Sequence, residues 1–133
     1  MHDLKSLETE RLRLRPLLAR DAEVIEQLLN DRTLASHTES IDFPYPKGEA
    51  SRWIDQNCDR WQIGEAYVLA ICQKEAERPI GTVELIANKQ HHRAELSYWI
   101  GPDFWNQGYA TEAATCIVRY GFKELGFARI TSQ

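Results

Sequence analysis

The chain has 133 residues, of which 43% are hydrophobic and 27% are charged, and its formal net charge is −4. This length fits one domain with a sizeable core, so we expect residues 1–133 to form a single domain. The composition excludes a disordered chain, and no apolar run approaches the ~20 residues that span a bilayer. The N-terminus lacks the apolar region of a secretory signal, so no membrane association is expected. The acidic balance disfavours a nucleic-acid partner.

Cysteine and histidine usage indicates neither a disulfide framework nor a metal site. Cys58, Cys72 and Cys116 are odd in number, far apart and without a C-x-x-C pair. His91 and His92 fall in a turn with no carboxylate or cysteine at ligand spacing, so no metal is assigned. This pattern is typical of a cytoplasmic protein.

Strict alternation of arginine and leucine in residues 10–17 predicts a half-buried strand that ends at Pro16. Arg11, Arg13 and Arg15 then share one face of that strand. The face is either a phosphate-binding stripe or the solvated outer face of an edge strand. The second interpretation agrees better with the usual exposure of arginine.

Two helices and a loop are expected next. Residues 21–30 form an amphipathic pattern with Asp21 at the N-cap. Residues 33–46 are polar and carry two prolines, which predicts a surface loop able to hold substrate contacts. Residues 47–63 then predict a second helix, whose inner face consists of Ala50, Trp53, Ile54, Asn57 and Trp61.

The second half of the chain changes period. Three apolar runs of strand length, joined by short polar turns, predict an antiparallel meander over residues 66–72, 80–87 and 94–100. A helix with a small-residue apolar face follows over residues 109–125, and Gly126 is suited to its C-cap. Residues 127–131 begin one more strand.

The predicted order is therefore β-α-α-β-β-β-α-β, a mixed α+β fold with a central, mostly antiparallel sheet and helices on both faces. Its single parallel step leads from the strand ending at Ile100 to the strand at Ile130. Because the chain stops at Gln133, soon after this strand begins, we expect C-terminal elements of the fold to be missing. The unpaired edge at Ile130 would favour self-association, for example as a homodimer.

The junction in residues 95–112, ELSYWIGPDFWNQGYATE, carries the chemistry that the sequence suggests. A strand turns there into a helix, so unpaired backbone N–H groups and the positive end of the helix dipole point at one spot. Gly108 and Ala110 permit close approach of a ligand, and no N-cap side chain occupies the amides. The junction is either an anion site, most often for phosphate, or an ordinary turn before a helix.

These residues resemble a known family. Residues 105–113, WNQGYATEA, together with the order of elements, resemble the GNAT superfamily of acyl-CoA-dependent N-acyltransferases. The opening ETERLRLRP, the segment ELSYWIGPDFW and the ending GFARI resemble the branch that acetylates the N-termini of ribosomal proteins. The family loop, Gln/Arg-x-x-Gly-x-Gly/Ala, maps onto residues 105–110, with Trp105 in place of Gln or Arg.

The resemblance implies an enzyme that transfers an acetyl group from acetyl-CoA to a primary amine, either a protein N-terminus or a small molecule. Backbone groups of Tyr98, Trp99 and Ile100 would pair with the pantetheine arm, and an amide near Ile100 would polarise the thioester. The loop implied to hold the CoA pyrophosphate consists of Trp105, Asn106, Gln107, Gly108, Tyr109, Ala110 and Thr111.

The reaction also needs a base, because an amine with a pKa of about 8 to 10 must lose its proton. Glu84 and Glu95 lie within apolar strands, where burial would raise the pKa of a carboxylate, and both are candidate catalytic residues. Alternatively, both face solvent. Glu112 is expected only to favour the helix dipole. The resemblance puts the proton donor on a helix beyond Gln133.

Two other functions stay open at this stage. The chain is alternatively a CoA-binding module without catalytic activity, or an interaction domain in which the Gly108 turn is purely structural. Thermal stabilisation by CoA would separate the first of these from the second.

Overall fold

A mixed sheet of six strands forms the centre of the structure, a computed structural model that describes residues 6–37 and 41–132. Its strands are β1 (Leu7–Glu8), β2 (Leu12–Pro16), β3 (Ala66–Gln73), β4 (Pro79–Asn88), β5 (Arg93–Ile100) and β6 (Arg129–Ser132). They lie side by side in chain order, and all neighbours are antiparallel except β5 and β6, which are parallel. The predicted meander and its single parallel step are therefore confirmed.

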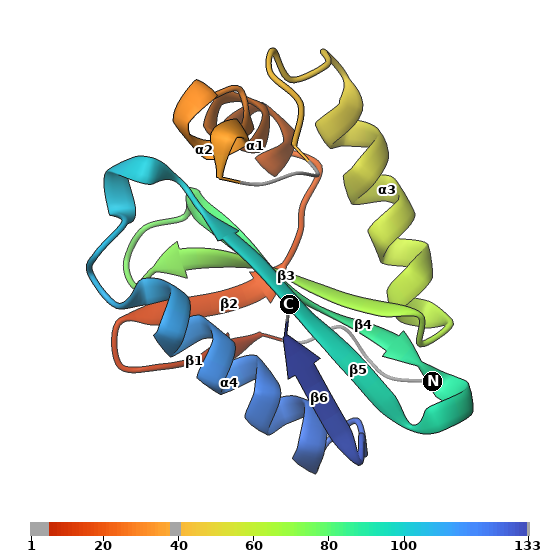
Figure 1. The fold of residues 1–133 in the computed structure, drawn as a ribbon. Coiled ribbons are helices and arrows are strands. Elements are labelled where there is room, and N and C mark those ends of the chain that lie inside the picture. The colour runs from red at the N-terminus through yellow and green to blue at the C-terminus, as the bar shows by residue number, and fades with distance from the viewer. Residues whose placement is uncertain (1–5, 38–40, 133) are drawn as a thin grey trace.

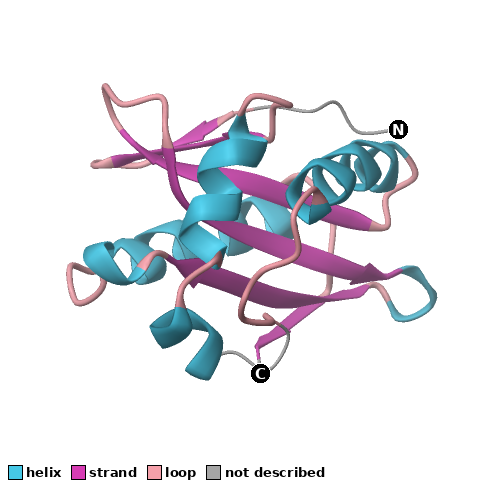
Figure 2. Ribbon diagram, turned by 90° about the horizontal axis from the view of Figure 1, so that it is seen from above, coloured by secondary structure: helices cyan, strands magenta, loops and turns pink. Residues whose placement is uncertain are grey.

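Helices cover both faces of this sheet (Figures 1 and 2). They are α1 (Asp21–Leu29), α2 (Arg32–Ser36), α3 (Glu49–Gln62) and α4 (Tyr109–Lys123), with short 3-10 turns η1 (Lys89–His91) and η2 (Pro102–Phe104). Helices α1 and α3 pack on one face, against β4 and β3, and α4 packs on the other, against β2, β4 and β5. The predicted mixed α/β architecture is confirmed. No helix within the described residues is long and apolar enough to cross a membrane.

The alternating strand patterns build a core on each side of the sheet. On the α4 side, the fully buried aliphatic side chains include Leu12, Leu14, Leu69, Ile71, Val83, Leu85 and Ile117. The α1 and α3 side holds a second cluster of Ile25, Leu29, Leu34, Ala50 and Ile54. Each fully buried side chain of this size contributes about 1.5–3 kcal/mol.

The predicted loop over residues 33–46 is partly wrong, because α2 begins it. The side chain of Asp31 caps this helix by accepting a hydrogen bond from the backbone N–H of Leu34 at 3.0 Å. Leu34 is buried in the α1 and α3 cluster, which fixes the short helix against the fold. Residues 38–40 of the predicted loop lie outside the described residues.

The strand with alternating arginines differs from the prediction in two respects. Strand β2 is not an edge strand, because Leu7 and Glu8 pair with it as β1. Arg11 and Arg13 are exposed, as predicted, and Arg13 pairs with Glu8 at 3.1 Å. Arg15 lies instead in a nearly buried ion pair.

The partner of Arg15 is Asp21, which corrects the assignment of Asp21 as an N-cap. Asp21 is the first residue of α1, and Arg20 occupies the N-cap without a side-chain hydrogen bond. The Arg15 guanidinium donates to both carboxylate oxygens of Asp21, at 2.7 and 2.8 Å. These bonds raise the pKa of Arg15 despite the opposing effect of burial.

Candidate active site

The pairing of the parallel strands β5 and β6 is described over half of the length of β5, as far as Ser132, the last described residue. Their pairing extends from Arg93 opposite Arg129 to Leu96 opposite Ser132. Beyond that point, residues 97–100 have no strand neighbour on this side within the described part of the chain (Figure 1). A strand edge with unused backbone groups can bind an extended ligand as an added strand.

Hydrogen bonds at the end of β5 identify which backbone groups face this open edge. The N–H of Gly101 donates to the carbonyl of Ile80 on β4 at 2.8 Å. Hydrogen-bonded and non-bonded pairs alternate along an antiparallel ladder. The N–H and C=O of Trp99 are therefore directed at its partner Thr82, within the sheet. The backbone groups of the two neighbouring residues point the other way.

The open edge thus carries the backbone groups of Tyr98 and Ile100. One of these groups already has a partner, since the indole N–H of Trp105 donates to the carbonyl of Ile100 at 2.6 Å. The N–H and C=O of Tyr98 and the N–H of Ile100 remain directed at the open side. These three groups lie along one strand edge, where they can pair with the amide groups of a pantetheine arm.

The chain then turns into α4 through two residues with left-handed backbone. Asn106 has a φ of +63° and Gly108 a φ of +82°. Gly108 is the N-cap, and no side chain caps the helix, as predicted. The N–H of Glu112 makes the first helical bond, to the carbonyl of Gly108 at 3.0 Å. The amides of residues 109–111 therefore precede that bond and point out of the helix N-terminus, an arrangement that fits a diphosphate.

A residue from the other end of the chain is fastened to this helix start. Arg11 donates through Nε to Glu112 Oε1 at 2.7 Å, and through its backbone N–H to Glu112 Oε2 at 2.9 Å. Thr9 also donates its hydroxyl to Glu112. Burial alone would raise the pKa of Glu112, but these bonds outweigh it and lower the pKa. Glu112 therefore does more than favour the helix dipole.

The two candidate catalytic carboxylates lie on one face of the sheet, on the side of α3. Glu84 is opposite Ser97 and Glu95 is opposite Ile86, so the two are diagonal neighbours with Cα atoms about 7–8 Å apart. Glu84 is half-buried. Burial raises its pKa, Glu95 raises it further, and Arg60 partly opposes the shift.

Glu84 is next to the open half of β5. Its partner Ser97 directly follows Leu96, the last residue of β5 that pairs with β6. The Cβ atoms of directly opposite residues lie about 4.5–5.5 Å apart. A carboxylate with a raised pKa therefore lies one strand away from the end of the described pairing between β5 and β6.

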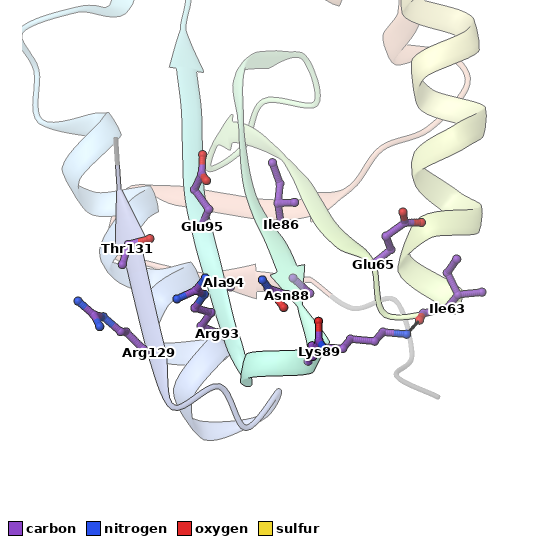
Figure 3. Close-up of a pocket in the computed structure, with 12 residues that line it drawn as sticks. Ile63, Glu65, Ile86, Asn88, Lys89, Arg93, Ala94, Glu95, Arg129 and Thr131 are labelled. Carbon is purple, nitrogen blue, oxygen red and sulfur yellow. Dashed lines mark hydrogen bonds between the residues drawn. The ribbon is translucent and has the colours of Figure 1, made fainter.

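Glu95 lines an open groove of about 960 Å³ on this face (Figure 3). Glu65 lies at the side of the groove nearest α3, and Ile86 lies between Glu65 and Glu95. The cationic side chains of the groove gather nearer the β4–β5 turn: Lys89, Arg93 and Arg129. Within residues 6–37 and 41–132, no group of three or more potential ligands is placed to hold a metal ion.

Comparison with known proteins identifies the fold and the site together. The family model of the acetyltransferase (GNAT) domain matches residues 11–133. The chain belongs to the GNAT acetyltransferase family. It is 32% identical over 130 residues to the uncharacterized N-acetyltransferase YoaA of Bacillus subtilis, covering 93% of this chain and 70% of YoaA.

Solved structures agree with this assignment. A candidate ribosomal-protein-serine acetyltransferase from Vibrio cholerae superposes with a TM-score of 0.77 at 28% identity, covering 95% of this chain and 71% of that one. A microcin self-immunity acetyltransferase, solved with acetyl-CoA and AMP, has a TM-score of 0.74 at 21% identity, covering 90% and 66%. The second likeness shows a shared fold alone.

The resemblance seen in the sequence is therefore confirmed. The reaction of this GNAT acetyltransferase is the transfer of an acetyl group from acetyl-CoA, its co-substrate, to an amine. Nothing in the comparisons favours the alternative of a CoA-binding module without activity. Sequence reasoning weighed Arg11 only as part of an arginine stripe and did not place it at the helix start, because no local pattern in residues 9–11 indicates a partner about a hundred residues away.

Proposed function

We propose that acetyl-CoA binds along β5 and the start of α4, and that Glu84 removes the proton of the acceptor amine. The observation that supports this proposal is that the open edge of β5 and the N-terminus of α4 are continuous. The open edge at Tyr98 and Ile100 leads directly, through Gly101, to the uncapped N-terminus of α4. One extended ligand with a diphosphate can use both.

The cofactor-binding residues then have distinct roles. The amides of residues 106–110, with the Thr111 hydroxyl nearby, hold the diphosphate. Tyr98 pairs with the pantetheine arm through both backbone groups, and the Ile100 N–H polarises the thioester carbonyl. Such a donor is worth about 2.7–4 kcal/mol in the transition state. Trp105 holds the loop to the end of β5 through its bond to Ile100, and Trp99 keeps its backbone within the sheet.

The chemical step transfers the acetyl group directly between the two substrates. The neutral amine attacks the thioester carbonyl carbon, the C–N bond forms and the C–S bond breaks. CoA leaves as a thiolate, which becomes the thiol by taking up the proton that the acylated nitrogen loses. Glu84 takes the amine proton, directly or through a water. Its raised pKa suits this task better than that of an ordinary carboxylate. Glu95 supports it by raising the Glu84 pKa.

The acceptor approaches from the side of α2. His37, at the C-terminal end of α2, makes an edge contact with Trp105, with ring centroids 5.1 Å apart. The C-terminal end of α2 therefore adjoins the cofactor loop. We take a protein N-terminus as the first acceptor class to test, because the sequence resemblance implies it and the Vibrio cholerae neighbour is described as a ribosomal-protein-serine acetyltransferase. Cytoplasmic location, the absence of a nucleic-acid partner and a homodimer stay predictions from the sequence.

The test combines binding with turnover. We expect free thiol to appear when the protein is mixed with acetyl-CoA and a panel of N-terminal peptides and small amines. Gly108→Glu should abolish CoA binding, because it places a side chain and a negative charge at the diphosphate site. Gly126→Glu is the matched control: Gly126 also has a positive φ, +76°, but lies past the far end of α4.

Each result decides between the candidate functions. Undiminished CoA affinity in Gly108→Glu would exclude the loop as the diphosphate site. Stabilisation by CoA without thiol release for any amine would instead identify a CoA-binding module.

A further inference from the structure

The guanidinium of Arg11 is oriented by the loop at the start of α4. Two hydrogen bonds fix it, one from Nε to Glu112 Oε1 at 2.7 Å and one from Nη1 to the carbonyl of Gln107 at 2.9 Å. The backbone N–H of Arg11 also donates to Glu112 Oε2, at 2.9 Å. The guanidinium carbon also lies 4.5 Å from the centre of the Tyr109 ring. The side chain therefore has one defined position, although 44% of it is exposed.

One nitrogen of this guanidinium is left for a ligand. Among the described residues, none accepts a hydrogen bond from Nη2 of Arg11. This nitrogen lies beside Gly108, since a Cβ atom built on Gly108 would be 3.2 Å from it. The open donor is therefore at the residue that directly precedes α4, where the amides of the first turn point.

The position of the Arg11 guanidinium beside the N-terminus of α4 favours an anionic ligand. The N-terminus of a helix carries partial positive charge, which disfavours a nearby cation unless an anion is also present. Glu112 neutralises one side of the guanidinium. An arginine with a free nitrogen beside a helix N-terminus is suited to a phosphate oxygen, which both can bind.

The cofactor loop itself supplies no cationic side chain. Residues 105–111, WNQGYAT, contain neither lysine nor arginine. The first position is Trp105, and its only polar group is bonded to the carbonyl of Ile100. A positive charge for the diphosphate must therefore come from another element, and Arg11 is the cation fastened to this loop.

We propose that Arg11 is a cofactor-binding residue, which donates through Nη2 to the diphosphate of CoA while Glu112 and the Gln107 carbonyl hold it in place. This inference rests on the proposed position of acetyl-CoA. If Arg11 only ties β2 to α4, its replacement should instead weaken the binding of every ligand of the site to the same extent.

The test compares the binding of CoA, which has the diphosphate, with the binding of pantetheine, which does not. Dissociation constants for CoA and for pantetheine, which lacks the diphosphate and the nucleotide, are measured by calorimetry for the wild type and three variants. Arg11→Gln should weaken CoA binding about 10- to 100-fold, the usual range for a charged hydrogen bond, and leave pantetheine binding unchanged. Arg13→Gln is the matched control, because Arg13 lies on the same strand and its ion-pair partner among the described residues is Glu8, at the surface. It should bind both ligands like the wild type.

The third variant, Arg11→Lys, keeps the charge and loses the fork of donors. Arg11→Lys should weaken CoA binding less than Arg11→Gln does. If Arg11→Gln does not fold, Arg11→Lys is used for the comparison in its place. Equal weakening of CoA and pantetheine, or unchanged CoA binding, would overturn the role of Arg11. A wild-type protein that binds neither ligand would instead refute the proposed cofactor site, so the two failures are distinguishable.

Discussion

Replacing Glu84 by Gln removes the proposed base and keeps the size of the side chain. A positioned general base contributes about 10²- to 10⁴-fold to the rate, so kcat/KM should fall by that factor. Glu95→Gln is the matched control on the same sheet face. Glu95 raises the pKa of Glu84, so its removal should keep most of the maximal rate and shift the acid limb of the pH profile to lower pH.

The stability of Glu84→Gln separates a chemical effect from damage to the fold. Burial raises the pKa of Glu84 in the folded protein above its unfolded value, so folding favours the protonated carboxyl. Stability is therefore greatest below the unfolded pKa and decreases as the pH rises through the folded pKa. Gln carries no charge, and the variant should be at least as stable as the wild type at neutral pH.

The assay is thiol release at saturating acceptor from about pH 5 to about pH 9. We expect a wild-type acid limb above the ordinary range for glutamate, and no such limb in Glu84→Gln. An unchanged kcat/KM in Glu84→Gln, or an acid limb that persists in it, would refute the assignment. Thermal unfolding of the same samples checks the stability: a large loss would mean that Glu84 supports the fold and not the chemistry.

Three further predictions concern the loop and the core. The pKa of Glu112 is lowered, so its contribution to the free energy of unfolding is present above the ordinary pKa of about 4.3 and is lost as the pH falls through the pKa of the folded protein. Urea unfolding at a series of pH values should therefore show that Glu112→Gln loses less stability in acid than the wild type does. Trp105→Phe keeps the ring but removes the donor to Ile100, and calorimetry should show CoA binding weakened about 2- to 10-fold. Ile117→Ala opens a cavity at a fully buried position of α4, and denaturant unfolding should show a loss of about 2–5 kcal/mol.

Local periodicity was sufficient to predict most of the elements. The apolar runs that became β3, β4 and β5 end within a residue or two of their predicted bounds, because strand length and turn chemistry are local properties. The uncapped start of α4 at Gly108 was also predictable, since it depends only on which residues stand before the helix.

Contacts between distant segments could not be predicted in this way. Arg11, Arg13 and Arg15 alternate identically in the sequence, yet one is bonded to α4, one to β1 and one to α1. Their different environments depend on where Glu112 and Asp21 lie after folding.

The cofactor loop is held from both sides by side chains. On one side the indole of Trp105 is bonded to the end of β5, and on the other Glu112 is bonded to Arg11 and Thr9. Two residues of the loop have left-handed backbone, so the loop depends on these anchors to keep its amides aligned. A ligand that binds only this arrangement stabilises the fold, by about 2.7 kcal/mol at a concentration of 100 times Kd. Stabilisation by CoA should therefore decrease when either anchor is removed, and removal of both should decrease it more than the sum of the single losses, because they hold the same loop.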